Sequence, residues 1–86
     1  MNNPEHEKFF GWVESLLRRE HRATLHSIDP VRKGGEFLWR IVGERSGVIF
    51  NVDVPIEAGE AIRGRVALAR ISLGLTLHFT DRESDG

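Results

Sequence analysis

The chain has no cysteine and no tyrosine, and only three prolines among its 86 residues. Without cysteine it can form neither a disulfide framework nor a thiolate nucleophile, and it has no cysteine-type zinc site. No apolar run approaches the ~18 residues of a membrane-spanning helix, so we expect no membrane association. The N-terminus has no basic segment leading into an apolar one, which argues against a secretory signal. We therefore expect a cytoplasmic protein of bacterial or phage type.

An excess of one charge is also missing. The chain has 12 Lys and Arg against 13 Asp and Glu, a formal net charge of −1. Proteins that bind nucleic acid non-specifically usually show a basic excess, so this composition argues against that class. The length allows one domain at most. We expect a single small domain over residues 1–80 and a frayed acidic tail over residues 81–86, which contain no apolar side chain.

The N-terminal region predicts an amphipathic helix. Asn3 is a suitable cap, and Pro4 fits the first turn. Large apolar side chains then recur at helical spacing and form one stripe. The stripe consists of Phe9, Phe10, Val13, Leu16 and Leu17, and Trp12 lies beside it.

Three strands are expected next. The first covers residues 23–28 and is stopped by Asp29 and Pro30. The second and third cover residues 36–42 and 48–54, alternate between apolar and polar positions, and form an antiparallel hairpin. In this hairpin Phe37, Trp39 and Ile41 share one face.

Residues 56–73 are ambiguous. A helix would start near Pro55, bury Ile62, Val66, Ala69 and Leu73, and end at Gly74. A strand would place Ile71, Leu73, Leu75, Leu77 and Phe79 on one face, after a bulge. In both interpretations residues 75–79 form a closing strand. The predicted order is αβββαβ, or αβββββ as the alternative, and both are α+β with the first helix packed on an antiparallel sheet.

Catalytic and metal-binding patterns are not evident. The four histidines stand at no recognised ligand spacing, and a zinc site needs three or four convergent ligands. No serine lies in a G-x-S-x-G motif. Residues 33–35, KGG, are followed by a predicted strand and not by the helix that a phosphate-binding loop requires. We therefore expect a protein that is not an enzyme and that uses no cofactor and no metal.

Two aromatic residues of the second strand allow two interpretations. With the neighbouring basic residues, Phe37 and Trp39 could form an exposed RNA-binding platform. The alternative is that both belong to the core, because so small a domain has few other large side chains to bury. We favour the core.

The sharpest functional question concerns residues 60–70, EAIRGRVALAR, which contain three arginines. Neither a helix nor a strand would bring all three to one face, so a solvated surface is the favoured interpretation. The leading hypothesis is a binding module for another protein, and a homodimer through an edge strand or the Trp12 side of the helix is also expected. The alternative is a nucleic-acid-binding module using Arg40, Arg45, Arg63 and Arg70. The candidate partner-binding residues are Trp12, Arg40, Arg45, Arg63, Arg65 and Arg70.

Overall fold

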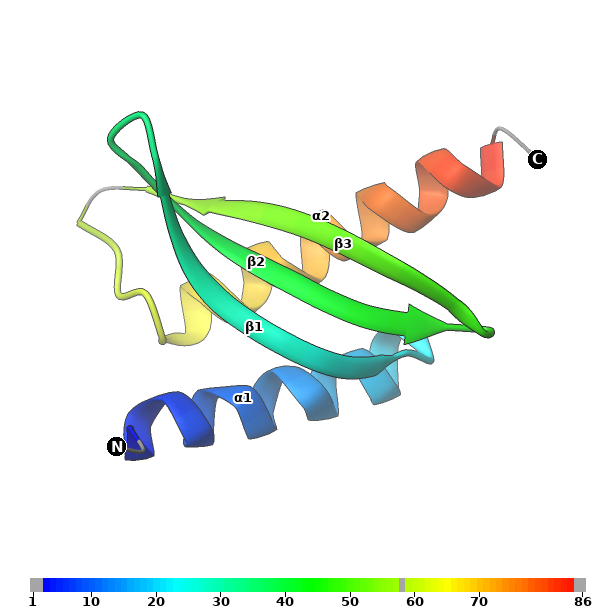
Figure 1. Cartoon of the computed structure of the whole chain (residues 1–86), viewed down its shortest axis with the longest axis horizontal. Helices are drawn as coiled ribbons and strands as arrows, with labels where there is room; N and C mark the ends of the chain where they lie inside the picture. Colours follow the sequence, from blue (N-terminus) through cyan, green and yellow to red (C-terminus); the bar gives the residue numbers. More distant parts are fainter. Residues whose placement is uncertain (1–2, 58, 85–86) are drawn as a thin grey trace.

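The computed structural model of the chain describes residues 3–57 and 59–84, with the side chains of all of these except residues 82–84. Its elements follow the order αβββα, and both helices lie on the same face of a three-stranded sheet (Figure 1). The elements are α1 (Pro4–Leu16), η1 (Leu17–His21), β1 (Thr24–Lys33), β2 (Glu36–Arg45), β3 (Val48–Ile56) and α2 (Arg65–Ser84). The predicted α+β class, with the N-terminal helix packed on an antiparallel sheet, is confirmed.

Helix α1 begins at its predicted cap. The side-chain Oδ1 of Asn3 accepts hydrogen bonds from the backbone N–H groups of Glu5 (3.0 Å) and His6 (3.3 Å). These N–H groups have no partner within the helix, so the cap satisfies them. The helix continues into the π-helical segment η1, which ends at Arg22 in the left-handed conformation, with φ of 52°.

The sheet is an antiparallel meander in the order β1–β2–β3, so β1 and β3 are both edges. The hairpin predicted from the alternating pattern is present as β2 and β3. Strand β1 runs further than predicted, because it passes through Asp29 and Pro30 and ends at Lys33. Proline cannot donate a hydrogen bond to a neighbouring strand, but an edge strand has one side without a neighbour and can accommodate it.

The prediction for the C-terminal part is wrong. Residues 75–79 lie within α2, so they do not form a closing strand, and the order is neither αβββαβ nor αβββββ. The helix begins at Arg65, well after Pro55, and passes through Gly74. A Cβ atom at Gly74 would lie 3.0 Å from Cγ2 of Val54. This glycine therefore allows α2 to approach β3 closely and does not end the helix.

The core lies between the sheet and the two helices. Helix α1 packs against β1, and α2 packs against β3. The stripe of α1 and the face of β2 that were predicted to be apolar are either buried or packed against the core as partly buried side chains. Phe9, Val13, Leu17, Trp39, Ile41 and Phe50 are buried, and Leu16, Phe37 and Val52 are partly buried. From α2 the buried side chains are Ala67, Ile71, Leu75 and Phe79.

The other face of the sheet is covered by neither helix (Figure 1). Strand register places Arg40 between Asp29 and Asp53 in one row of this face and Val42 between Ser27 and Asn51 in the next. Neither helix, over the residues described, is long and apolar enough to cross a membrane.

Alanine substitutions at two glycines should change the free energy of unfolding in opposite directions. A Cβ at Gly43 would lie 2.5 Å from the Thr24 carbonyl oxygen and 2.7 Å from Cζ of Phe50, whereas one at Gly11 would meet nothing within 4 Å. Gly43→Ala should therefore lower the free energy of unfolding by about 1–3 kcal/mol through overpacking. Gly11→Ala, within α1, should raise it by about 0.5–1 kcal/mol. Urea denaturation measures both changes, and a neutral Gly43→Ala would contradict the register of β1, β2 and β3.

Candidate functional site

The structure spreads the six sequence-predicted residues over several surfaces. Arg40 lies on the uncovered sheet face and Arg45 at the end of β2. Arg63 precedes α2, and Arg70 lies within it. Only Trp12 and Arg65 come together, since both line a groove between α1 and α2. The prediction that residues 60–70 do not present their three arginines as one cluster remains consistent with these positions.

Arg70 is engaged by two carboxylates of the loop before α2. Its Nε and Nη2 atoms donate to the Glu60 carboxylate at 2.8 and 2.7 Å, and Glu57 lies 3.6 Å from Nη2. The hydrogen bonds from Arg70 hold the pKa of the Glu60 carboxyl below its ordinary value. A bidentate pair of this kind fixes the loop on the helix and leaves Arg70 little capacity for an external phosphate.

Arg63 is also held within the fold. Its guanidinium carbon lies 5.3 Å from the centroid of the Trp39 ring, within cation–π range, and its Nη2 lies 3.5 Å from Nδ1 of His6. Trp39 itself is fully buried. This burial overturns the possibility of an exposed RNA-binding platform on β2 and confirms that Trp39 belongs to the core.

Arg40 and Arg45 make contacts at different ends of the sheet. Arg40 donates two hydrogen bonds to Asp53, at 3.0 and 3.1 Å, which hold the pKa of that carboxyl below its ordinary value. The guanidinium of Arg45 stacks over the ring of Phe79, 4.3 Å from its centroid. Both arginines therefore connect elements of the scaffold.

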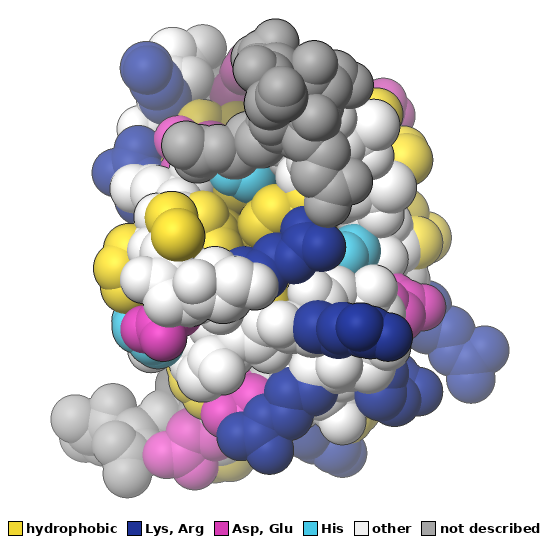
Figure 2. All heavy atoms as spheres, turned by 90° about the vertical axis from the view of Figure 1, so that its right-hand side faces the viewer, with side chains coloured by type: hydrophobic (Ala, Val, Ile, Leu, Met, Phe, Trp, Pro, Cys, Tyr) yellow, Lys and Arg dark blue, Asp and Glu magenta, His cyan; other side chains and the backbone are white. Residues whose placement is uncertain are grey.

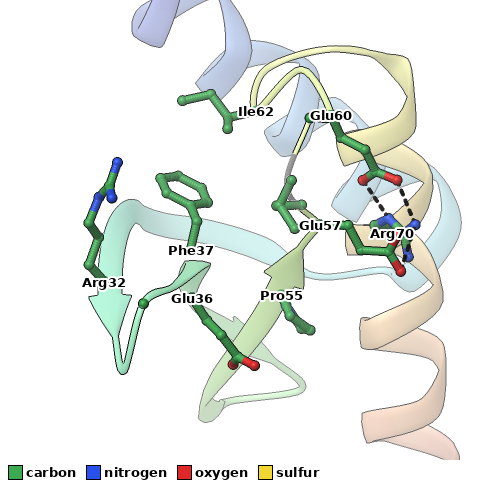
Figure 3. Close-up of a pocket in the computed structure, with 11 residues that line it drawn as sticks. Arg32, Glu36, Phe37, Pro55, Glu57, Glu60, Ile62 and Arg70 are labelled. Atoms are coloured by element: carbon green, nitrogen blue, oxygen red, sulfur yellow. Dashed lines mark hydrogen bonds and ion pairs between the residues drawn. The ribbon is translucent and has the colours of Figure 1, made fainter.

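A pocket of about 630 Å³ lies where the loop after β3 folds over the end of the sheet (Figure 3). Its floor is a row across the sheet, formed by Arg32, Phe37 and Ile56. Figure 3 shows Phe37 between Arg32 on one side and the Glu60–Arg70 pair on the other. The volume is in the range of small-molecule sites. Three of the charged groups in its lining, Glu57, Glu60 and Arg70, bond one another, so these three offer a ligand little free hydrogen-bonding capacity.

The end of the molecule at the right of Figure 1 is basic. Figure 2 shows Lys and Arg side chains gathered across this end, with histidine side chains beside them. η1 supplies Arg18 and Arg19, and a hollow beside it is lined by Arg22 and Arg45. Cations at the C-terminal end of a helix stabilise its dipole, which accounts for part of this cluster without a ligand.

A serine and a histidine come together between η1 and α2. Nε2 of His21 lies 3.3 Å from Oγ of Ser72, and the Ser72 hydroxyl donates to the Glu20 carboxylate at 2.8 Å. A serine nucleophile must instead donate its proton to the imidazole. The cluster thus fastens η1 to α2. Within the described residues there is also no group of three His, Asp or Glu side chains that could hold a metal ion.

An apolar ridge on α2 was missed by the sequence analysis. Val66, Leu73 and Leu77 are 50%, 59% and 57% exposed, on the side of α2 that faces away from the sheet. The helical interpretation had placed Val66 and Leu73 on the buried face, which was wrong. Large exposed side chains gathered along one helix mark an interaction surface more often than scattered ones do.

The comparisons with known proteins add no relative. No protein-family model matches the chain, and searches of the curated proteins and of the solved structures give no significant match.

His21 makes stability depend on pH. Burial lowers the pKa of His21, the Glu20 carboxylate opposes this, and Arg45 adds to it. The unfolded chain then binds more protons than the folded one just below pH 6.5, so stability should fall as the pH drops through that region. We expect a lower free energy of unfolding at pH 5.5 than at pH 7.5, measured with urea.

His21→Gln should reduce this difference, whereas His26→Gln, which changes an exposed histidine, should retain it. An unchanged pH dependence in His21→Gln would contradict the role given to His21.

Proposed function

We propose that this protein is a non-enzymatic module that binds another protein through the ridge formed by Val66, Leu73 and Leu77. The partner surface that fits it is an apolar face of a helix. Accessory subunits, immunity or antitoxin-like proteins and phage-type inhibitors all act by such contacts, and the proposal covers this class.

The observation that carries the proposal is that α2 has apolar side chains on two opposite sides. Its inner side buries Ala67, Ile71 and Leu75, while its outer side exposes Leu73 and Leu77. A helix at the surface of a globular domain normally has one apolar stripe and a polar opposite side. A second stripe on the solvent side costs solubility and adds nothing to the core, so a partner that covers it explains its presence.

The spacing of the ridge supports a helical partner. Steps of seven and four residues separate Val66, Leu73 and Leu77, so the three side chains follow one line along α2. Such a line is the pattern that packs into the grooves of a second helix. The groove beside the ridge is lined by Leu16, Leu68 and Leu73 among others, which extends the apolar surface toward α1.

The proposed binding can be tested by capture from the native host. Leu73→Glu/Leu77→Glu places charges on the ridge, so this variant should lose the proteins that the wild type retains. Val48→Glu/Ile49→Glu is the matched control, because Val48 and Ile49 are equally exposed but lie at the start of β3. Circular dichroism first establishes that both variants are folded. Equal capture by all three proteins would contradict the ridge as the binding surface.

Nucleic-acid binding was the alternative function, and the basic end of Figure 2 is the observation that favours it. The internal contacts of Arg40, Arg63 and Arg70 argue against it. At near-physiological salt we expect no binding to duplex DNA, duplex RNA or single strands tighter than the ~10⁻⁴–10⁻⁶ M of non-specific contacts. Fluorescence anisotropy measures this. Nanomolar binding that weakens steeply with salt and is lost in Arg18→Ala/Arg22→Ala would replace the proposed function.

A further inference from the structure

Helix α1 carries a second unpartnered surface, separate from the ridge on α2. Glu5, Trp12 and Arg19 follow one another at intervals of seven residues, so they lie along nearly one line on the exposed side of the helix. Trp12 is 45% exposed. The α2 residues that share a groove with Trp12 are Arg65 and Leu68, which precede the Leu73–Leu77 part of the ridge.

The two ends of this line carry opposite charges, negative at Glu5 and positive at Arg19. Neither the Glu5 carboxylate nor the Arg19 guanidinium has an ion-pair partner among the residues that the structure describes. This distinguishes Arg19 from Arg40 and Arg70, which hold carboxylates of their own chain. At the centre of the line, the Trp12 ring has the Lys8 ammonium 5.6 Å from its centroid.

We propose that the occupant of this surface is a second copy of the chain, packed with α1 antiparallel to α1 and the two-fold axis beside Trp12. An interface of this symmetry must be complementary to itself, so that each contact occurs twice. Seven residues of α-helix rise about 10.5 Å, which separates Glu5 from Trp12 along the axis, and Arg19, beyond Trp12 toward the C-terminus, lines the same groove as Trp12. The axis therefore stacks one Trp12 near the other and places each Glu5 opposite the Arg19 of the other copy.

Two features of the surface favour a second copy over an unrelated protein. Along the line the side chains are acidic, aromatic and basic, so a second copy in the opposite direction pairs each acidic side chain with a basic one. In addition, Ser15 lies one turn before Arg19 in the groove beside Trp12 and carries no charge, so it does not repel Glu5 of the other copy. Arg19 lies in the π-helical segment η1, whose turns contain more residues than α-helical turns, and it still lines the groove beside Trp12.

The expected dimer is weak, because the surface offers one aromatic anchor and exposed ion pairs. A standard interface removes about 800 Å² from each partner, which is roughly one seventh of the 5899 Å² accessible surface of this chain. The surface proposed here consists of one helix face with the flanking side chains of Arg65 and Leu68. We therefore expect a reversible dimer that dissociates in the micromolar range. The inference goes beyond the proposed function, because it concerns α1 and leaves Leu73 and Leu77 free.

Charge reversal with sedimentation equilibrium tests the inference. Glu5→Arg alone and Arg19→Glu alone each replace two attractions by two repulsions, so each should weaken the dimer by about tenfold or more. An equimolar mixture of the two variants should associate with nearly wild-type affinity, since every Glu then faces an Arg of the other copy. Trp12→Ala should abolish the dimer. Arg18→Glu, which changes an exposed neighbour outside the line, is the matched control and should have little effect.

Specific outcomes would overturn the inference. One is a wild-type monomer of about 10 kDa throughout the micromolar range. Another is a dimer that resists Trp12→Ala and both charge reversals, which would assign association to an edge strand. A dimer lost in Leu73→Glu/Leu77→Glu but kept in Trp12→Ala would assign it to the ridge. Far-UV circular dichroism establishes in each case that the variant is folded. The capture experiment decides the proposed function independently of all these results.

Discussion

The packing of Trp39 is the interaction on which the rest of the structure depends. Its ring is fully buried at the centre of the sheet and lies 5.2 Å from the Phe9 ring of α1, centroid to centroid. Its indole Nε1 donates to the backbone carbonyl of Ile62 at 2.7 Å. One side chain thus connects the middle strand, the first helix and the loop that leads to the second helix. A buried indole N–H without an acceptor would cost about 1–3 kcal/mol, which makes the position of this loop strongly preferred.

The position of the loop in turn determines which side of α2 faces outward. With Ile62 held on Trp39 and Arg70 held on Glu60, the start of α2 is fastened at two points. Farther along, Gly74 allows close contact with Val54 of β3. These contacts set the rotation of the helix about its own axis. As a result Leu73 points to solvent, and the ridge on which the proposed function rests is a consequence of the core.

Several arginines therefore make contacts within the fold, and several apolar side chains are exposed, where arginines are usual. Arginine is a common residue at binding sites, yet Arg40, Arg63 and Arg70 act within the scaffold. The apolar side chains for which we propose partners, Trp12 on α1 and Leu73 and Leu77 on α2, are exposed instead. Because the Trp12 surface and the ridge are on different helices, a dimer formed through α1 would present two ridges. Such an arrangement raises the avidity for a partner that is itself repeated.

Much of the fold was predictable from sequence, because its signals are local. Asn3 and Pro4 mark the start of α1, and strict alternation marks β2 and β3, since both depend on residues close in the chain. The rule that alternating apolar residues mark a strand failed over residues 71–79. There Ile71, Leu73 and Leu75 alternate as in a strand, but a helix sends alternate residues to opposite sides. Only the packing of α2 against β3 decided that this segment is helical.

Some properties of the candidate surfaces were likewise predictable from the sequence, and others were not. The sequence by itself determined the absence of cysteine chemistry, the balanced charge and the amphipathic character of α1, with Trp12 beside its apolar stripe. It could not determine which arginines are engaged, because the partners of Arg40 and Arg63 come from other elements. Nor could it separate the buried side of α2 from the exposed ridge, since both are apolar. The tertiary structure decided these points, because burial and pairing depend on which distant segments meet.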